Sequence, residues 1–364
     1  MEAAVQKIPE QETQLEAENF NIDKTIAKYI PKKFSRDDII FTLNTPRYAY
    51  SLEALNKALA EPIWEFLERG GKRWRPKLFL LVCEALGRNP EDYLEYAMIP
   101  EVIHNGALMV DDVEDQSELR RGRPCTFRTY GLDVAINSGN AMYFLPLLPL
   151  IHNRKRIPPD TLSKVYGVYA QHMITLSFGQ AIDISWHRGQ VEVTEITEKE
   201  YLQMCAYKTG TLAAMAAKMA AILSQANDEL TERLGEYAEA VGVAFQIQDD
   251  ILDLTGKTFA KAKGTIGADV TEGKTTLIVI RTLQKAMPDD RVRLAEILRM
   301  HTTDQSLRDE AISIMKKYDA ITYAKKYARK MLEESWSEIE NLLPPSEAKQ
   351  KLRAFADLLV EREV

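Results

Sequence analysis

The chain has 364 residues, 45% of them hydrophobic, and a formal net charge of −7. This composition supports a large core and argues against a general binder of nucleic acid or of anionic membranes. The three cysteines, Cys83, Cys125 and Cys205, form no CxxC pair, so we expect no disulfide framework, no zinc site and a reducing, cytoplasmic location. We find no signal peptide and no unbroken apolar run of the roughly 20 residues that a membrane span needs.

Residues 1–35 are polar with mixed charge, and we expect an N-terminal extension that is loose or packs late, ahead of one domain over residues 36–364. A helical pattern begins near Tyr48 and ends at the Gly70-Gly71 pair. After a basic stretch, a second helix covers Leu78 to Leu86. Helical sequence resumes near residue 91, where Pro100 either kinks the helix or restarts it.

Further helices are predicted at about 133–153, 159–187, 196–225, 228–254, 273–286, 305–318, 320–342 and 346–362. The alanine-rich segment 210–226 allows helices to approach closely. No stretch shows the two-residue period of a strand. The sequence therefore predicts an all-α fold, a large single-domain helical bundle.

The segment 111–115 contains four acids in five residues, and the DDxxD spacing returns in segment 249–253. On a helix, Asp111 and Asp115 lie one turn apart on the same face. Apolar sequence precedes both clusters, so a solvated surface explains the pair poorly. Carboxylates suit Mg²⁺, which also bridges to substrate phosphates. Two acidic helix faces therefore predict a shared magnesium site.

Two basic stretches complement the acids, and they consist of Lys72, Arg73 and Arg75, and of Arg120, Arg121 and Arg123. Each is unremarkable as ordinary surface. Together with the acids they predict a bipolar site, because Arg and Lys bind phosphate oxygens while carboxylates hold metal ions. Such a site suits a substrate with a diphosphate leaving group.

His104 is expected to face the first acid cluster, because it precedes Asp111 by about two helical turns. The Glu101-x-x-His104 unit is also found in di-iron carboxylate bundles, but the other histidines provide no second unit. A buried structural histidine remains an alternative.

Several motifs occur together in the order typical of one family. They are Gly71-Lys72-x-x-Arg75-Pro76, His104, Asp111-Asp112-x-x-Asp115 with Arg120-Arg121-Gly122, Gly179-Gln180-x-x-Asp183, Lys208-Thr209, Phe245-Gln246-x-Gln248-Asp249-Asp250-x-x-Asp253, and Gly273-Lys274. From about residue 45 to its end, the chain resembles the trans-isoprenyl diphosphate synthases, which include the farnesyl and geranylgeranyl diphosphate synthases.

The resemblance implies an isoprenoid synthase fold around a deep central cavity, usually as a homodimer, and condensation of isopentenyl diphosphate with an allylic diphosphate. It implies Mg²⁺, with three ions when substrate is bound, held by Asp111, Asp115 and Asp249 with Asp112, Asp250 and Asp253 in support. It assigns the allylic diphosphate to Arg120, Lys208 and Lys274, and isopentenyl diphosphate to Lys72, Arg75, His104 and Arg121. Thr209 and Gln246 would face the carbocation. One departure is Lys263-Gly264, where many relatives carry Gly-Lys, so this lysine is shifted or its phosphate contact is missing.

Small residues at Gly106 and Ala107, before the first aspartate motif, argue against a farnesyl (C15) stop. The stretch 136–144 resembles the helix of fungal and animal geranylgeranyl diphosphate synthases whose Tyr-Phe pair closes the cavity, here Tyr143 and Phe144. Ordinary core aromatics are the alternative, and Ser177 leaves the floor incomplete if relatives have a larger residue there. We expect a C20 product.

Other functions remain open at this point. The first alternative is a longer-chain synthase (C25 or above), and less favoured ones are a class I terpene cyclase or a non-catalytic subunit of a heteromeric synthase. The second DDxxD motif argues against both of the latter. A helical scaffold without a site would leave the paired motifs unexplained.

Overall fold

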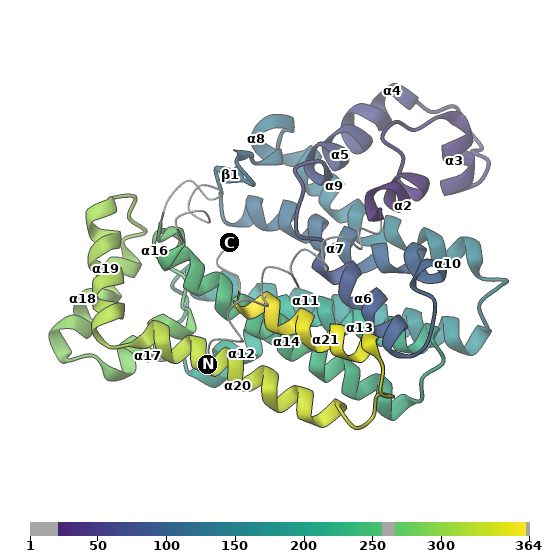
Figure 1. Ribbon diagram of the computed structural model, residues 1–364. Helices are drawn as coiled ribbons and strands as arrows, with labels where there is room; N and C mark the ends of the chain where they lie inside the picture. The colour runs from purple at the N-terminus through teal and green to yellow at the C-terminus, as the bar shows by residue number, and fades with distance from the viewer. Residues whose placement is uncertain (1–20, 257–265, 362–364) are drawn as a thin grey trace.

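The computed structural model describes residues 21–256 and 266–361, and these form a helical bundle (Figure 1). Its first half contains α2 (Ile22–Tyr29), α3 (Arg36–Leu43), α4 (Leu52–Leu55), α5 (Glu61–Leu67), α6 (Trp74–Ala85), α7 (Leu94–Glu114), α8 (Thr126–Tyr130), α9 (Leu132–Phe144), α10 (Leu148–Asn153) and α11 (Pro159–His187). Its second half contains α12 (Glu198–Cys205), α13 (Thr211–Leu223), α14 (Asp228–Thr255), α16 (Ala268–Glu272), α17 (Leu277–Lys285), α18 (Pro288–Arg299), α19 (Gln305–Lys317), α20 (Ala320–Ile339) and α21 (Glu347–Glu361).

Short elements complete the described chain. They are two π-helical segments (Asn56–Ala60 and Ala206–Gly210), two 3₁₀ turns (Pro90–Tyr93 and Leu145–Leu147) and the two-residue strands β1 (Leu119–Arg120) and β2 (Arg123–Pro124). The strands pair antiparallel and form a small hairpin within the second basic stretch. All other elements of the described chain are helical, so the all-α prediction is confirmed.

Helix α13 is the centre of the bundle, and it contacts α6, α7, α11 and α14. Nearly every side chain in it is buried, as expected for a helix that is apolar on all sides. Its alanines allow neighbouring backbones to approach closely. Helices α20 and α21 pack on the outside of α14, and α21 also covers α6 (Figure 1).

Glycines bring three helices together around the π-helical segment Ala206–Gly210. A Cβ on Gly179 of α11 would lie 2.3 Å from the backbone nitrogen of Lys208, and one on Gly242 of α14 would lie 2.6 Å from the Cα of Gly210. These contacts leave no room for a side chain. They fix Lys208 and Thr209 between α11 and α14.

The region before residue 36 was expected to be loose or to pack late, and the part that the structure describes is packed. Helix α2 packs on α7, and Ile22, Ile26 and Ile30 are buried in the main core. Asn21 caps the helix by accepting a hydrogen bond from the backbone of Lys24. Residues 21–30 thus belong to the packed structure, whereas the domain boundary at residue 35 stays a prediction.

The long helical patterns predicted the main helices well. Helix α7 continues through Pro100 instead of restarting there, and the pattern at 133–153 is divided into α9, a 3₁₀ turn and α10. By length and composition alone, the stretch Leu132–Asn153 is apolar enough to cross a membrane, and 44% of its most apolar window is buried in the fold. Pro146 and Pro149 lie inside this stretch, and the 3₁₀ turn Leu145–Leu147 interrupts the helix there.

Candidate active site

The first acid cluster lies at the C-terminal end of α7, where two cations and one amide from three other segments contact it. The Nζ atom of Lys208 lies 3.0 Å from Asp111 and 2.5 Å from Asp183, and Arg120 lies 3.5 Å from Asp111. Gln180 donates hydrogen bonds to Asp111 (2.8 Å) and to Glu114 (2.7 Å). The predicted carboxylates and phosphate-binding cations are therefore brought together.

Protonation in this cluster depends on burial and on charge. Burial alone would raise the pKa of Asp111, but Lys208 and Arg120 hold it below its usual value. Burial and the charge of Asp111 raise the pKa of Asp115 to about 7. The pair therefore carries less negative charge than two independent carboxylates unless a further cation binds.

Asp112 holds Arg120 in place beside Asp111. Its Oδ1 atom accepts hydrogen bonds from Arg120, at 2.7 Å from Nε and 2.6 Å from a terminal nitrogen. Asp112 is fully buried, and this two-point contact fixes the plane of the guanidinium. The geometry favours a role for Asp112 in positioning Arg120 rather than in metal binding.

Lys274 connects the two acidic regions. Its Nζ atom lies 4.0 Å from Asp115 on α7 and 3.8 Å from Asp269 on α16, and it pairs with Glu272. The backbone N–H of Asp269 donates to Asp253 of the second cluster (3.0 Å). One cation thus lies between the two predicted aspartate motifs.

The second cluster ends a buried chain of hydrogen bonds. Thr209 donates to the Oε1 atom of Gln246 (2.9 Å), whose amide donates to Asp250 (2.9 Å), and the Tyr201 hydroxyl also donates to Asp250 (2.6 Å). Burial and the charge of Asp269 raise the pKa of Asp250 to about 8. The predicted neighbours Thr209 and Gln246 are therefore in direct contact.

A second group of cations surrounds His104. Burial lowers the pKa of His104 well below its usual value, and four arginines add to this effect, namely Arg75, Arg121, Arg120 and Arg73. Arg75 is buried and lies over the ring of Trp74, 4.4 Å from the ring centre. Burial lowers the pKa of Arg75 to about 10, although the negative charges of Glu101 and Asp249 act in the opposite direction. So many cations in one buried place favour an anionic ligand.

Local structure explains the other residues of this region. Arg73 adopts a left-handed conformation (φ 46°) and pairs with Glu101 (2.8 Å) and Asp23 (3.0 Å), so it joins α6 to α7 and α2. Arg121 lies against Gly71, where a Cβ would come within 2.9 Å of the guanidinium. Lys72 is exposed at the start of α6. Arg73 pairs with Glu101, the carboxylate of the Glu101-x-x-His104 unit, which the sequence had already disfavoured as part of a di-iron site.

The chain-length residues divide into three kinds. Tyr143 is half-buried. Its burial raises the pKa of its phenol, and the charges of Glu114 and Asp111 raise it further, so the phenol lies near the first cluster. Phe144 is 65% exposed on the outside of α9, so within one chain it does not close a cavity as expected. Helix α7 touches α9 at Gly106, where a Cβ would lie only 2.7 Å from the carbonyl oxygen of Gly139, so a larger residue does not fit. Ala107 packs against the core.

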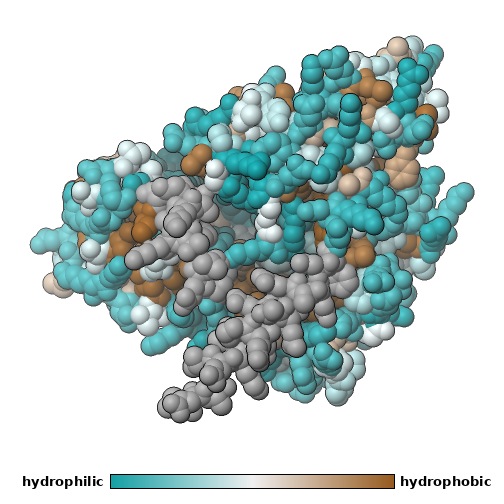
Figure 2. All heavy atoms as spheres, turned by 45° about the horizontal axis from the view of Figure 1, so that its top comes forward, coloured by the Kyte–Doolittle hydropathy of each residue, from teal (hydrophilic) through white to brown (hydrophobic). Residues whose placement is uncertain are grey.

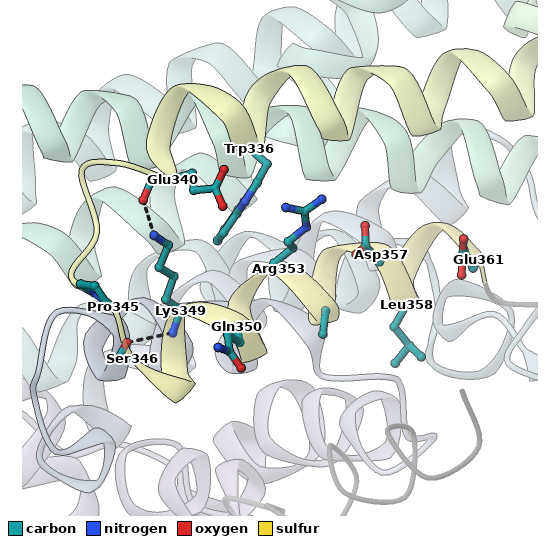
Figure 3. Close-up of a pocket in the computed structure, with 11 residues that line it drawn as sticks. Trp336, Glu340, Pro345, Ser346, Lys349, Gln350, Arg353, Asp357, Leu358 and Glu361 are labelled. Atoms are coloured by element: carbon teal, nitrogen blue, oxygen red, sulfur yellow. Dashed lines mark hydrogen bonds between the residues drawn. The ribbon is translucent and has the colours of Figure 1, made fainter. Parts of the chain in front are cut away.

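A groove of about 560 Å³ lies elsewhere, between α20 and α21 (Figure 3). Arg353 lies 5.7 Å from the ring centre of Trp336, which contacts Tyr237 near the start of α14. Asp249 lies twelve residues further along α14, or roughly 18 Å at the helical rise. The groove is therefore separate from the acid clusters.

Comparison with known proteins agrees with this arrangement. The polyprenyl synthetase family model matches residues 56–315. The chain belongs to the polyprenyl synthetase family. Membership makes it a trans-prenyltransferase, and the family uses Mg²⁺.

Three similar proteins illustrate the range of the polyprenyl synthetases. A short chain isoprenyl diphosphate synthase of Methanothermobacter thermautotrophicus is 34% identical over 81% of this chain and 87% of its own length. A geranylgeranyl diphosphate synthase of Methanosarcina mazei is 32% identical over 82% and 87%. The crystal structure of the geranylgeranyl pyrophosphate synthetase from Pyrococcus horikoshii has 30% identity and a TM-score of 0.81, covering 98% of this chain and 99% of that one.

Sequence reasoning did not place Gln180, Asp183, Glu114, Tyr201 and Asp269 among the site residues. Gln180 and Asp183 stand in a quoted motif, so that signal was available. Tyr201 precedes Asp250 by 49 residues on another helix, and no local pattern relates the two. Lys263 lies outside the described residues.

Proposed function

We propose that this prenyltransferase condenses isopentenyl diphosphate with an allylic diphosphate in the trans configuration, releases pyrophosphate and gives geranylgeranyl diphosphate (C20). The observation that carries the proposal is the division of the cations into two groups. Lys208 and Lys274 contact the first acid cluster, and Arg75 and Arg121 lie around His104. Arg120 pairs with Asp112 and also adds its charge at His104, so the two groups are neighbours. One group fits a metal-bound allylic diphosphate and the other the second diphosphate.

The donor set fits Mg²⁺, and we propose Asp111, Asp115 and Asp249 as its ligands, with three ions when substrate is bound. Asp111 and Asp115 share a helix face and already attract Lys208 and Lys274. Within residues 21–256 and 266–361, no three His, Cys, Asp or Glu side chains gather as a metal site by themselves. In the proposed complex the diphosphate would supply further oxygen ligands to the ions.

The reaction follows from the chemistry of this site. When bound, Mg²⁺ would neutralise the diphosphate leaving group. Arg120, Lys208 and Lys274 would stabilise the negative charge that develops as the allylic C–O bond breaks and its electron pair leaves with pyrophosphate. The C=C bond of isopentenyl diphosphate attacks the allylic cation, and the proton then lost goes to pyrophosphate. Thr209 and Gln246 would place their dipoles toward the cation.

The product length rests on Tyr143 of α9, whose phenol is near the acids Glu114 and Asp111 at the end of α7. A longer product is the second candidate, because Phe144 and Ser177 do not close the cavity within one chain. A geranylfarnesyl diphosphate synthase of Natronomonas pharaonis, 31% identical over 81% of this chain, is also among the relatives.

We further propose that two copies of the chain associate through α9 and α11. Ile136, Phe144, Ile174 and Phe178 are between 38% and 65% exposed, and on each helix they are spaced to share one face. None of these side chains is charged. An exposed apolar face of this kind is typical of a subunit interface.

The three cysteines are free and buried, which supports a reducing cytoplasmic location.

A product assay tests the reaction. The purified chain is incubated with isopentenyl diphosphate and with dimethylallyl, geranyl or farnesyl diphosphate, in Mg²⁺ or in EDTA, and the dephosphorylated prenols are sized by mass. A C20 alcohol that requires Mg²⁺ supports the whole proposal, and a longer alcohol replaces only the chain length. Folded protein that condenses no primer would favour a cyclase or a partner-dependent subunit.

Two variants test the residue assignment. Asp111→Ala should lose most turnover, at least about a hundredfold, while circular dichroism and thermal unfolding show an intact fold. Lys72→Ala should raise the KM for isopentenyl diphosphate much more than that for the allylic substrate. Near-normal activity of the first variant, or equal losses for both substrates in the second, would contradict these assignments.

A further inference from the structure

One corner of the molecule, far from the acid clusters in sequence, combines exposed apolar side chains with a run of cations. Helix α3 and the segment after it expose Leu43 (65%), Tyr48 (75%), Ile40, Phe41 and Tyr50. Figure 2 shows brown, apolar side chains among hydrophilic ones at its upper right, over the region of α2 to α4. We call these five residues, together with Ile151 on α10, the apolar corner.

Helix α3 is apolar on both sides, and only one side is used in the fold. Ile39 is buried against Ala60 and Phe34 in a small separate core. The neighbouring Ile40 and Leu43 face water, so the helix has a surplus apolar face that the described chain does not cover. The capping box of Ser35 and Asp38 holds the start of the helix in place.

The cations lie near α3 on the side of Phe41. Phe41 stacks on His152, with ring centres 3.8 Å apart, and His152 is followed within four residues by Arg154, Lys155 and Arg156. All three are exposed, and none forms an ion pair within the described part of the chain. Arg47 also lies beside Tyr48, 5.2 Å from the ring centre. Within residues 150–160 these three cations face one exposed acid, Asp160, so this segment carries a net positive charge on a protein whose net charge is −7.

We propose that the apolar corner and the cations 154–156 bind the surface of a membrane that contains anionic phospholipid. Apolar side chains would enter the boundary between head groups and acyl chains, tyrosines favour that boundary, and the cations would contact lipid phosphates. Binding here would place the enzyme where amphiphilic prenyl diphosphates partition. The inference rests on the surface alone, so it can fail or succeed independently of the proposed reaction.

A second copy of the chain fits this corner less well. In a two-fold interface the same patch meets itself, so each copy of the cluster 154–156 would approach its own mate. Three unpaired cations facing three others repel each other. The face of α9 and α11 that we propose for the dimer exposes instead the apolar side chains Ile136, Phe144, Ile174 and Phe178.

Vesicle flotation tests the proposal with the full chain. Vesicles of phosphatidylcholine with a quarter of phosphatidylglycerol are compared with pure phosphatidylcholine, at low and at high salt. The wild type should bind the anionic vesicles and dissociate at high salt. The variant R154Q/K155Q/R156Q should bind at least about tenfold more weakly, because each surface cation contributes to the attraction. The variant L43S/Y48S should also bind more weakly, by a similar factor.

The matched control removes the same charge elsewhere. K316Q/K325Q/K326Q changes three exposed lysines on α19 and α20 and should bind like the wild type, and all variants should keep the wild-type turnover in solution. No binding by the wild type, no preference for anionic lipid, or an equal loss in the control overturns the proposal. A change of R154Q/K155Q/R156Q from dimer to monomer, measured by light scattering, would assign the corner to subunit contact instead and overturn it as well.

Discussion

At the scale of single residues, burial among arginines sets the protonation of His104. Its pKa in the folded protein is well below the value of about 6.5 for an unfolded chain. Between these two values the unfolded chain binds a proton that the folded chain does not. The contribution of His104 to stability is therefore present above pH 6.5 and is lost as the pH falls.

We predict that the free energy of unfolding decreases more steeply below pH 6.5 in the wild type than in His104→Gln. The difference in slope should approach about 1.4 kcal/mol per pH unit, the value for one proton. Denaturant titrations from pH 8 to pH 5 measure this slope. The difference in unfolding free energy between the two proteins at pH 8 accounts for any other effect of the substitution. Parallel curves for the two proteins would show that His104 titrates as in an unfolded chain.

Tyr143 and Phe144 differ in their surroundings, so we predict that they differ in effect. Tyr143→Ala should shift the prenol products to longer chains, because it removes the bulk next to the first acid cluster, whereas Phe144→Ala should shift them less. Mass analysis of the products from a farnesyl primer measures both. If Tyr143→Ala keeps the wild-type product, another residue closes the cavity.

The site was predictable where its residues belong to compact motifs, and not where they meet only in space. Asp111 and Asp115 are recognisable because a helix puts them on one face, and the cations near them follow from charge balance. Tyr201, which bonds to Asp250, stands alone in its helix. Arg73 looked like a phosphate ligand, but its contact with Glu101 depends on how α2, α6 and α7 pack.

At the scale of elements, the close contact of α7 and α9 holds the first acid cluster against Tyr143. A Cβ on Gly139 would lie 2.7 Å from a methyl group of Val110, one residue before Asp111, and 3.1 Å from the carbonyl of Gly106. Neither helix can give way without moving the cluster or α9.

We predict that Gly139→Ala destabilises the fold by about 1–3 kcal/mol through overpacking, and that it lowers kcat by displacing Asp111. Gly167→Ala is the matched control. Gly167 is an exposed position of α11, and its added Cβ would have no neighbouring atom within 4 Å, so this variant should be slightly more stable than the wild type. Thermal unfolding and turnover measure both. An equal response of the two variants would mean that the contact is not tight.

Elements of strong helical period were predictable, and their interruptions were not. The pattern at 159–187 gave α11 directly, because Pro159 starts it in the first turn and a long polar loop follows. The pattern at 196–225 concealed the π-helical segment Ala206–Gly210, which presents Lys208 and Thr209. That segment lies where Gly179 and Gly242 allow α11 and α14 to touch it, and this is a tertiary cause with no local signal.

At the scale of the whole molecule, the exposed faces decide how many copies associate. Ile136 on α9 is 38% exposed, and Ile174 and Phe178 on α11 are 54% and 64% exposed. If two copies meet on this face, these side chains and Phe144 become buried. The second copy would then complete the wall that Phe144 leaves open in one chain.

We predict that the wild type is a dimer in solution and that Ile136→Glu with Phe178→Glu makes it a monomer, because each carboxylate would be buried without a partner. Val292→Glu with Met287→Glu is the control, since these side chains are 59% and 67% exposed, on α18 and at its N-cap, and should leave the dimer intact. Light scattering after size exclusion gives the mass, and the product assay on the same samples shows whether chain length changes with association. A monomeric wild type, or a control that dissociates equally, would remove α9 and α11 as the interface and leave Tyr143 alone to limit the product.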